Sequence, residues 1–271
     1  MTIRDTKPAR TLELSVDIDA PLEQVWRAIT EGPGLANWLA PIGEVSAPGV
    51  GGDVKIAWSE EMAITTKVDT WEPNKRVGWL DEPSYMGPGT AIGMEWHLST
   101  ENGKTRVRMV QSGFGASEGW DSLFDGTEIG WRYFLENLRI YLEHHRGRTR
   151  HMISERLEIT APREAFWKHL LSASAGLVID GSTPVKKGDT VRVQIGNHAS
   201  KEVVELAVEN RALALRLADL GNALLFVELE GSGAPPFHTG FWFSVYDDAK
   251  ARELEAPSKR AFQRIRDTAA K

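Results

Sequence analysis

The stretch Trp120–His145, WDSLFDGTEIGWRYFLENLRIYLEHH, has the apolar spacing of a long amphipathic helix. From Thr127 onward it contains no proline, and bulky apolar residues recur three and four positions apart. These residues are Trp131, Phe134, Leu135, Leu138, Tyr141 and Leu142. Charges of alternating sign on the opposite side predict a solvated ladder of ion pairs. The charged residues are Arg132, Glu136, Arg139 and Glu143.

A second apolar stripe on the same helix consists of Ile129, Tyr133 and Ile140. A helix that is apolar on two sides is normally covered on both. We therefore expect this stripe to pack against the second half of the chain or against another subunit, which would make the protein a homodimer.

The residues before the helix alternate between apolar and polar in short runs, as strands that are half-buried do. The predicted strands are Thr11–Asp19, Gly43–Ala47, Asp53–Trp58, Met62–Trp71, Arg76–Leu80, Ala91–Thr100 and Lys104–Gln111. Asn102-Gly103 between the last two is a hairpin signal. Two short helices are expected between the first two strands. The order predicts a long C-terminal helix laid across an antiparallel sheet.

The pattern then restarts in the second half of the chain. The Pro21 and Trp26 pair recurs with the same spacing as Pro162 and Trp167, and Gly188-Asp189 repeats Gly52-Asp53. We therefore predict two copies of one unit, with domains at 1–147 and 148–271. Small aliphatic residues in the second sheet favour a filled core there. A final helix over 248–268 contains Pro257, which should kink or restart it.

Composition narrows the functional classes. The 271 residues carry a net charge of −6 and no cysteine, so disulfides and thiol chemistry are excluded. Neither half is basic enough to predict nucleic-acid binding. No run has the length and apolar character of a membrane span, so we expect a cytoplasmic protein with no membrane partner. Eight of the ten tryptophans precede residue 132, which places the expected site in the first half.

The ordered motifs resemble those of the SRPBCC (START-like, helix-grip) superfamily, in the branch related to the C-terminal domain of the heat-shock chaperone ATPase activator (Aha-type). They are Ala20-Pro21, Val25-Trp26, Trp38, Gly51-Gly52-Asp53, Trp71-Glu72-Pro73, Arg76 and Gly130-Trp131 through Leu142-Glu143. The resemblance implies an α+β fold of two tandem helix-grip (START-like) domains, each an antiparallel sheet wrapped on a long C-terminal helix. This fold hosts lipid transfer, hormone binding, cyclases and chaperone contacts, so it indicates architecture more than function.

The resemblance also implies a cavity between the sheet and the long helix. Its apolar lining would be Trp38, Trp58, Met62, Trp79, Trp96, Met109, Trp131, Phe134 and Leu138, with Tyr85 and Met86 at the mouth. Gln111 and Glu128 (or Thr127) are the candidate polar anchors. Such a site would bind a small hydrophobic or aromatic molecule. In the alternative interpretation, the aromatic side chains pack against one another and leave no space.

No pattern predicts catalytic residues, a metal or a cofactor. The histidines of the second half, His169, His198 and His238, have no acidic partner at ligand spacing, and no serine stands in a G-x-S-x-G motif. The expected function is therefore non-catalytic binding of a small hydrophobic molecule in the first domain. Two alternatives stay open: a chaperone-related protein interaction module, and a cyclase- or hydrolase-like enzyme that uses the same pocket.

Overall fold

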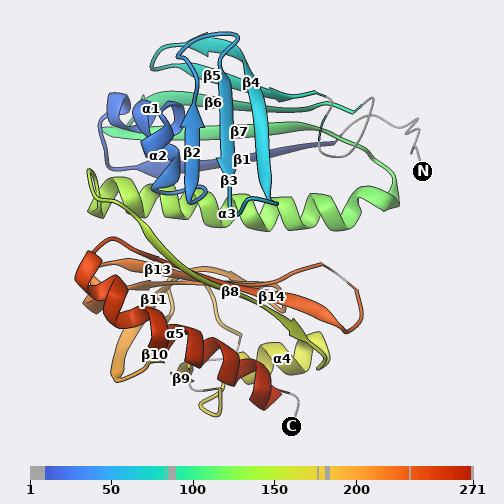
Figure 1. The fold of residues 1–271 in the computed structure, drawn as a ribbon, viewed down its shortest axis with the longest axis vertical. Coiled ribbons are helices and arrows are strands. Elements are labelled where there is room, and N and C mark those ends of the chain that lie inside the picture. The colour runs from blue at the N-terminus through green and yellow to red at the C-terminus, as the bar shows by residue number, and fades with distance from the viewer. Residues whose placement is uncertain are drawn as a thin grey trace. The chain divides into compact units, whose positions relative to one another are not determined.

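The chain divides into two compact units, Met1–Gly147 and Arg148–Lys271. The computed structural model describes residues 10–82, 84, 90–175, 177–180, 184–231 and 233–269. In each unit seven strands form one antiparallel sheet, and a long helix at the end of the unit packs on it (Figure 1).

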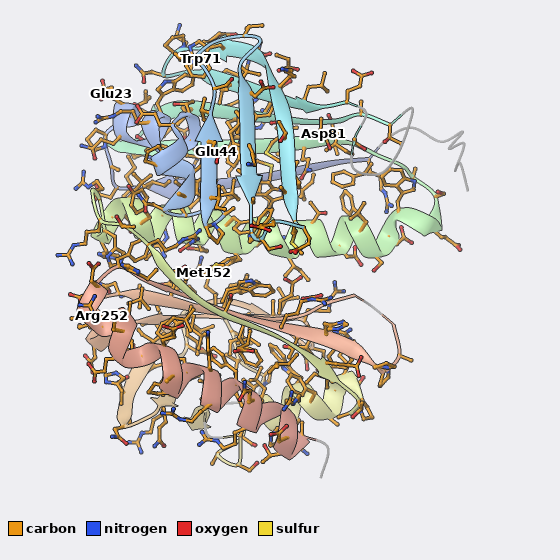
Figure 2. All side chains as sticks on the ribbon, in the orientation of Figure 1. Glu23, Glu44, Trp71, Asp81, Met152 and Arg252 are labelled. Atoms are coloured by element: carbon orange, nitrogen blue, oxygen red, sulfur yellow. The ribbon has the colours of Figure 1, made fainter. Side chains whose placement is uncertain are left out.

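The first unit follows the predicted order of elements, with boundaries shifted by a few residues. Its strands are β1 (Arg10–Ile18), β2 (Ile42–Val45), β3 (Asp53–Ala57), β4 (Ala63–Glu72), β5 (Arg76–Asp81), β6 (Ile92–Glu101) and β7 (Lys104–Phe114). Its helices are α1 (Leu22–Thr30), α2 (Gly32–Ala36), the 3-10 turn η1 (Glu118–Trp120) and α3 (Asp121–His144). The strands lie in the order β1-β7-β6-β5-β4-β3-β2. Side chains occupy the space between this sheet and α3 (Figure 2).

The β6–β7 hairpin fixes which side chains face α3. Asn102 and Gly103 both have positive φ, 52° and 78°, as a tight two-residue hairpin turn requires. The resulting register sets Trp96 opposite Met109 and Met94 opposite Gln111. Because directly opposed residues share a face, these four side chains point the same way. The predicted hairpin is confirmed.

The helix α3 spans Asp121–His144, within one residue of the predicted stretch at each end, and is less solvated than predicted. Arg132 pairs with Glu128 at 2.6 Å near the surface. Arg139 pairs with both Glu136 and Glu143, at 2.9 and 2.8 Å, and these three side chains are largely buried. The prediction of a solvated ladder is therefore wrong for this part of the helix.

The short helices α1 and α2 close one end of the space between the sheet and α3. Trp38, just after α2, donates from Nε1 to the carbonyl oxygen of Ala28 in α1 at 2.9 Å. From α3, the amide nitrogen of Asn137 donates to the carbonyl oxygen of Trp38. Asn37 also donates to the hydroxyl of Tyr141 at 3.3 Å. The two short helices thus contact the C-terminal half of α3. The N-terminal half of α3 is the less enclosed part.

The second unit repeats the same topology. Its strands are β8 (His151–Ile159), β9 (Val178–Asp180), β10 (Thr190–Ile195), β11 (His198–Val208), β12 (Ala212–Leu217), β13 (Ala223–Leu229) and β14 (Phe237–Val245). Its helices are α4 (Arg163–Leu170), the 3-10 turn η2 (Ala218–Leu220) and α5 (Asp248–Ala269). The strand order β8-β14-β13-β12-β11-β10-β9 matches the first sheet position by position.

The helix α5 continues through Pro257, so of the two predicted outcomes, a kink or a restart, the restart is wrong. It remains one helix because its apolar face packs on the sheet: Phe262 stacks on Phe241 of β14 at 4.5 Å between ring centroids. Pro257 itself lies against the β10–β11 turn, where a Cβ added to Gly196 would come within 2.9 Å of it. Packing of this kind offsets the main-chain hydrogen bond that proline removes. In the described part of the chain, no helix has the length and apolar character needed to cross a membrane.

Candidate functional site

Four indole rings meet between the first sheet and α3. Trp96 lies at their centre, with its ring centroid 5.7 Å from that of Trp38, 5.5 Å from Trp79 and 5.4 Å from Trp131. The Trp38 and Trp131 contacts are edge-to-face, the arrangement that the charge distribution of aromatic rings favours. At this depth the rings therefore touch one another, instead of lining separate walls.

The indole nitrogens of these four rings are satisfied unequally. Trp131 donates to the side-chain oxygen of Gln111 at 2.6 Å, and Trp38 donates to a main-chain carbonyl. The Nε1 atoms of Trp79 and Trp96 are buried and have no hydrogen-bond partner among the described residues. A buried donor without an acceptor costs about 1–3 kcal/mol. Two such donors on neighbouring rings mark a place where a hydrogen-bond acceptor would be stabilising.

Beside this buried group the interface becomes more accessible. The rings of Trp58, which follows β3, and Phe134 of α3 lie 6.1 Å apart, and both are half-buried. Phe134 also contacts Trp131, at 5.5 Å between centroids. Leu123 and Phe124, about three turns before Phe134 on α3, are half-buried as well. An apolar strip thus leads from the accessible N-terminal half of α3 to the indole group.

The predicted site residues fall into four groups. Seven are buried between the sheet and α3: Trp38, Trp79, Trp96, Met109, Gln111, Trp131 and Leu138. Three are half-buried: Trp58, Glu128 and Phe134. Met62 lies in the β3–β4 turn, 56% exposed. Tyr85 and Met86, the predicted mouth, lie outside the described residues.

The two candidate polar anchors have partners within the unit. The Gln111 oxygen accepts from Trp131, so this amide orients the ring as well as facing the interface. The Glu128 carboxylate accepts two hydrogen bonds from Arg132 on its own helix, at 3.0 and 2.6 Å. The charge of Glu128 is therefore paired with that of Arg132, four residues further along α3, and the carboxylate is not directed at the indole group.

In the second unit the fold brings together residues that the sequence left separate. Ligand atoms of His198, Glu202 and Asp219 all lie within 4.8 Å of one another. The spacing along the chain predicted no acidic partner for His198. Alternation along β11 places Glu202 on the same face as His198, and the position of η2 adds Asp219, which a linear pattern does not show.

An antiparallel sheet that grips a long C-terminal helix defines a helix-grip α+β domain, and the chain carries two of them in tandem. Residues 19–143 match the family described as "Activator of Hsp90 ATPase homolog 1-like protein". This match covers most of the first unit.

Several solved structures are similar to the chain. Protein MLL2253 from Mesorhizobium loti is 26% identical, covers 48% of this chain and 94% of its own, and has a TM-score of 0.41. The Aha1 dimer from Colwellia psychrerythraea is 27% identical over 51% of this chain and 99% of its own, with a TM-score of 0.42. The di-domain ARO/CYC BexL is 14% identical over 96% and 98%, with a TM-score of 0.44. None of the curated proteins matches the chain.

Proposed function

We propose that the first unit binds, without converting it, a small hydrophobic or aromatic molecule that carries a hydrogen-bond acceptor. The observation that supports this proposal is the pair of buried indole donors, Trp79 Nε1 and Trp96 Nε1, that lack an acceptor in the described structure. A carbonyl, ether or hydroxyl oxygen placed between α3 and β5–β6 would recover the hydrogen bonds that folding leaves unmade.

The surroundings of these donors fit an apolar ligand. The neighbouring side chains are rings and thioethers, and small-molecule sites are mostly apolar with a few polar groups that fix orientation. The half-buried pair Trp58 and Phe134 offers flat apolar surface beside the indole group. Since the rings of Trp96 and its neighbours are in contact, a ligand would enter by displacing Phe134 or Trp58, the two that retain exposed surface.

Native mass spectrometry of the full chain, purified from its own host, tests this proposal directly. A bound small molecule should appear as an added mass that is lost on denaturation. The second measurement uses acetophenone, an aromatic ketone, as the probe, and follows the indole N–H signals by NMR. The Trp79 and Trp96 signals should shift as the ketone binds.

Matched variants then assign the effect. Trp79→Phe keeps an aromatic ring and removes one donor, so it should weaken binding of the ketone about tenfold, the equivalent of one hydrogen bond. Trp167→Phe, in the second unit, is the control and should leave the affinity unchanged. No added mass together with unmoved indole signals would rule the proposal out.

A protein interaction module is the second candidate, and exposed apolar side chains support it. Ile42 on β2 is 43% exposed and pairs in register with Ala57, and Ala57 in turn pairs with Ala63, next to the exposed Met62. Ile42 and the turn that contains Met62 therefore lie at the same end of the sheet. Glu44, labelled in Figure 2, lies on the same edge strand as Ile42. The family description suggests an Hsp90-type chaperone as the partner.

The ATPase rate of a purified Hsp90-type chaperone from the same host distinguishes this candidate. Stimulation that Ile42→Asp abolishes, with unchanged melting, would support a chaperone contact at this edge. An unchanged ATPase rate would remove the chaperone and leave the small-molecule proposal untouched.

A further inference from the structure

A row of polar side chains faces the core of the second unit. In the β10–β11 pair, Ile195 is opposite His198, Val193 is opposite Ser200, and Val191 is opposite Glu202. The three β10 residues belong to the hydrophobic core. Since directly opposed residues share a face of the sheet, His198, Ser200 and Glu202 lie on the core-facing side.

This polar row is particular to the second unit. Val68 and Val204 occupy equivalent positions, because each exchanges main-chain hydrogen bonds with the loop before its neighbouring strand. Counting back along β4 and β11, Glu202 corresponds to Thr66, Ser200 to Ile64 and His198 to Met62. The first unit thus has two apolar residues and a threonine where the second has imidazole, hydroxyl and carboxylate.

The second unit adds another carboxylate to this row. Asp219 lies in η2, and its ligand oxygen, a carboxylate oxygen of Glu202 and a ring nitrogen of His198 are within 4.8 Å of one another. The main-chain N–H of Ala218 donates to Glu202 Oε2 at 2.8 Å, which ties η2 to β11. Zinc ligands lie about 2.0–2.2 Å from the ion and are therefore roughly 3–4 Å from one another. The three ligand atoms would have to move about 1 Å closer together to bind zinc.

Glu202 is a buried carboxylate without a cationic side chain. It is 1% exposed, and its partners in the described structure are the Ser200 hydroxyl and the Ala218 N–H. By contrast Glu205, on the same strand and 7% exposed, pairs with Arg216 at 2.6 Å. Buried charges are ordinarily paired or bound to a metal. Lys250, the nearby cation, is 3.4 Å from the main-chain oxygen of Asp219.

One polar group on the same side of the sheet has no hydrogen-bond partner among the described residues. Ser258 is fully buried on the inner face of α5, and its hydroxyl makes no hydrogen bond within the described residues. It follows Pro257, which lies against Gly196 in the turn that leads to His198. A hydrated ion beside this turn would supply the water molecule that such a hydroxyl needs.

We propose that His198, Glu202 and Asp219 bind a divalent transition-metal cation, with zinc as the best match. One imidazole and two carboxylates form a donor set that suits zinc and leaves a fourth position for water. A ring nitrogen of His198, Nε2, lies 3.1 Å from Ser200 Oγ. Ser200 Oγ also donates to Glu202 Oε1, so this hydroxyl bridges the imidazole and the carboxylate.

Titration calorimetry of the metal-stripped full chain with zinc chloride alone tests this site. We expect one ion per chain, and a melting temperature that rises with zinc concentration because binding stabilises the folded state. His198→Ala and Asp219→Asn should each weaken binding at least tenfold. Asp219 is exposed, so its variant should fold even if changes at Glu202 prevent folding.

His151→Ala is the matched control, because His151 is a strand histidine of the same unit that pairs with Asp248 outside the cluster. Its affinity for zinc should equal that of the unaltered chain. Absence of binding at millimolar zinc would overturn the proposal. Binding that persists at full strength in both His198→Ala and Asp219→Asn would overturn it equally.

Discussion

Replacing Glu228 by glutamine should abolish a pH dependence of stability that this one carboxyl imposes on the second unit. Glu228 lies on β13 between Ala212 and Gly240 of the neighbouring strands. Burial and, to a smaller extent, the charge of Glu230 raise its pKa, Arg211 opposes them in part, and the net result is a pKa of about 7 instead of 4.5. In the unfolded chain the same carboxyl ionises near its ordinary value.

The sign follows from which state holds the proton. Between pH 4.5 and about 7 the folded chain keeps a proton that the unfolded chain has released. Stability therefore falls as pH rises through this window, and the loss is complete above it. At roughly 1.4 kcal/mol for each pH unit the difference amounts to about 3 kcal/mol. This is an upper value, because Glu228 retains some exposed surface.

Urea denaturation at pH 4.5, 6, 7 and 8 measures the effect. Glu228→Gln should match the unaltered chain at pH 4.5 and exceed it at pH 8 by up to about 3 kcal/mol, since glutamine cannot ionise. Glu230→Gln is the control: it removes a neighbouring charge that pairs with Arg156, so it should reduce the slope without abolishing it. If the Glu228→Gln variant shows the same pH slope as the parent, the burial argument is wrong.

Three further predictions concern packing. Gly240→Ala should cost about 1–3 kcal/mol in unfolding free energy and alter tryptophan fluorescence, because the new Cβ would collide with the Trp242 ring; unchanged stability and emission would contradict this. Asn137→Ala should cost about 1–3 kcal/mol in unfolding free energy, because the buried carbonyl oxygen of Trp38 loses its donor. A loss below about 0.5 kcal/mol would contradict this. Tyr133→Lys combined with Ile140→Lys should lower the melting temperature or the oligomeric mass, as the second stripe of α3 predicts; if neither changes, that stripe has no packing role.

Much of the architecture could be predicted because local rules and tertiary structure agree. Strands with a period of two, the Asn-Gly turn and the repeat of Pro21 at Pro162 specify the two sheets and their hairpins. The predicted stretch begins at Trp120 and α3 begins at Asp121, although the helix has no side-chain capping hydrogen bond.

The candidate sites depend on information that a linear pattern does not carry. The spacing of tryptophans predicts that their rings gather, but not that Trp79 and Trp96 lack acceptors, since that depends on which carbonyls remain free after folding. Likewise Asp219 reaches His198 only through the β11–β12 register and the turn that follows β12. The sequence also did not determine which group pairs with Glu128, because an inward and an outward rotamer of a helical glutamate fit the same sequence.

The short edge strand of the first sheet determines how a partner could engage it. β2 has four residues, so few of its outward main-chain groups are available to template a foreign strand. A protein docking on this side would have to recognise side chains such as Ile42 instead of extending the sheet. Contacts of that kind are readily broken, and the brevity of β2 would therefore favour transient association over strand exchange and fibril-like assembly.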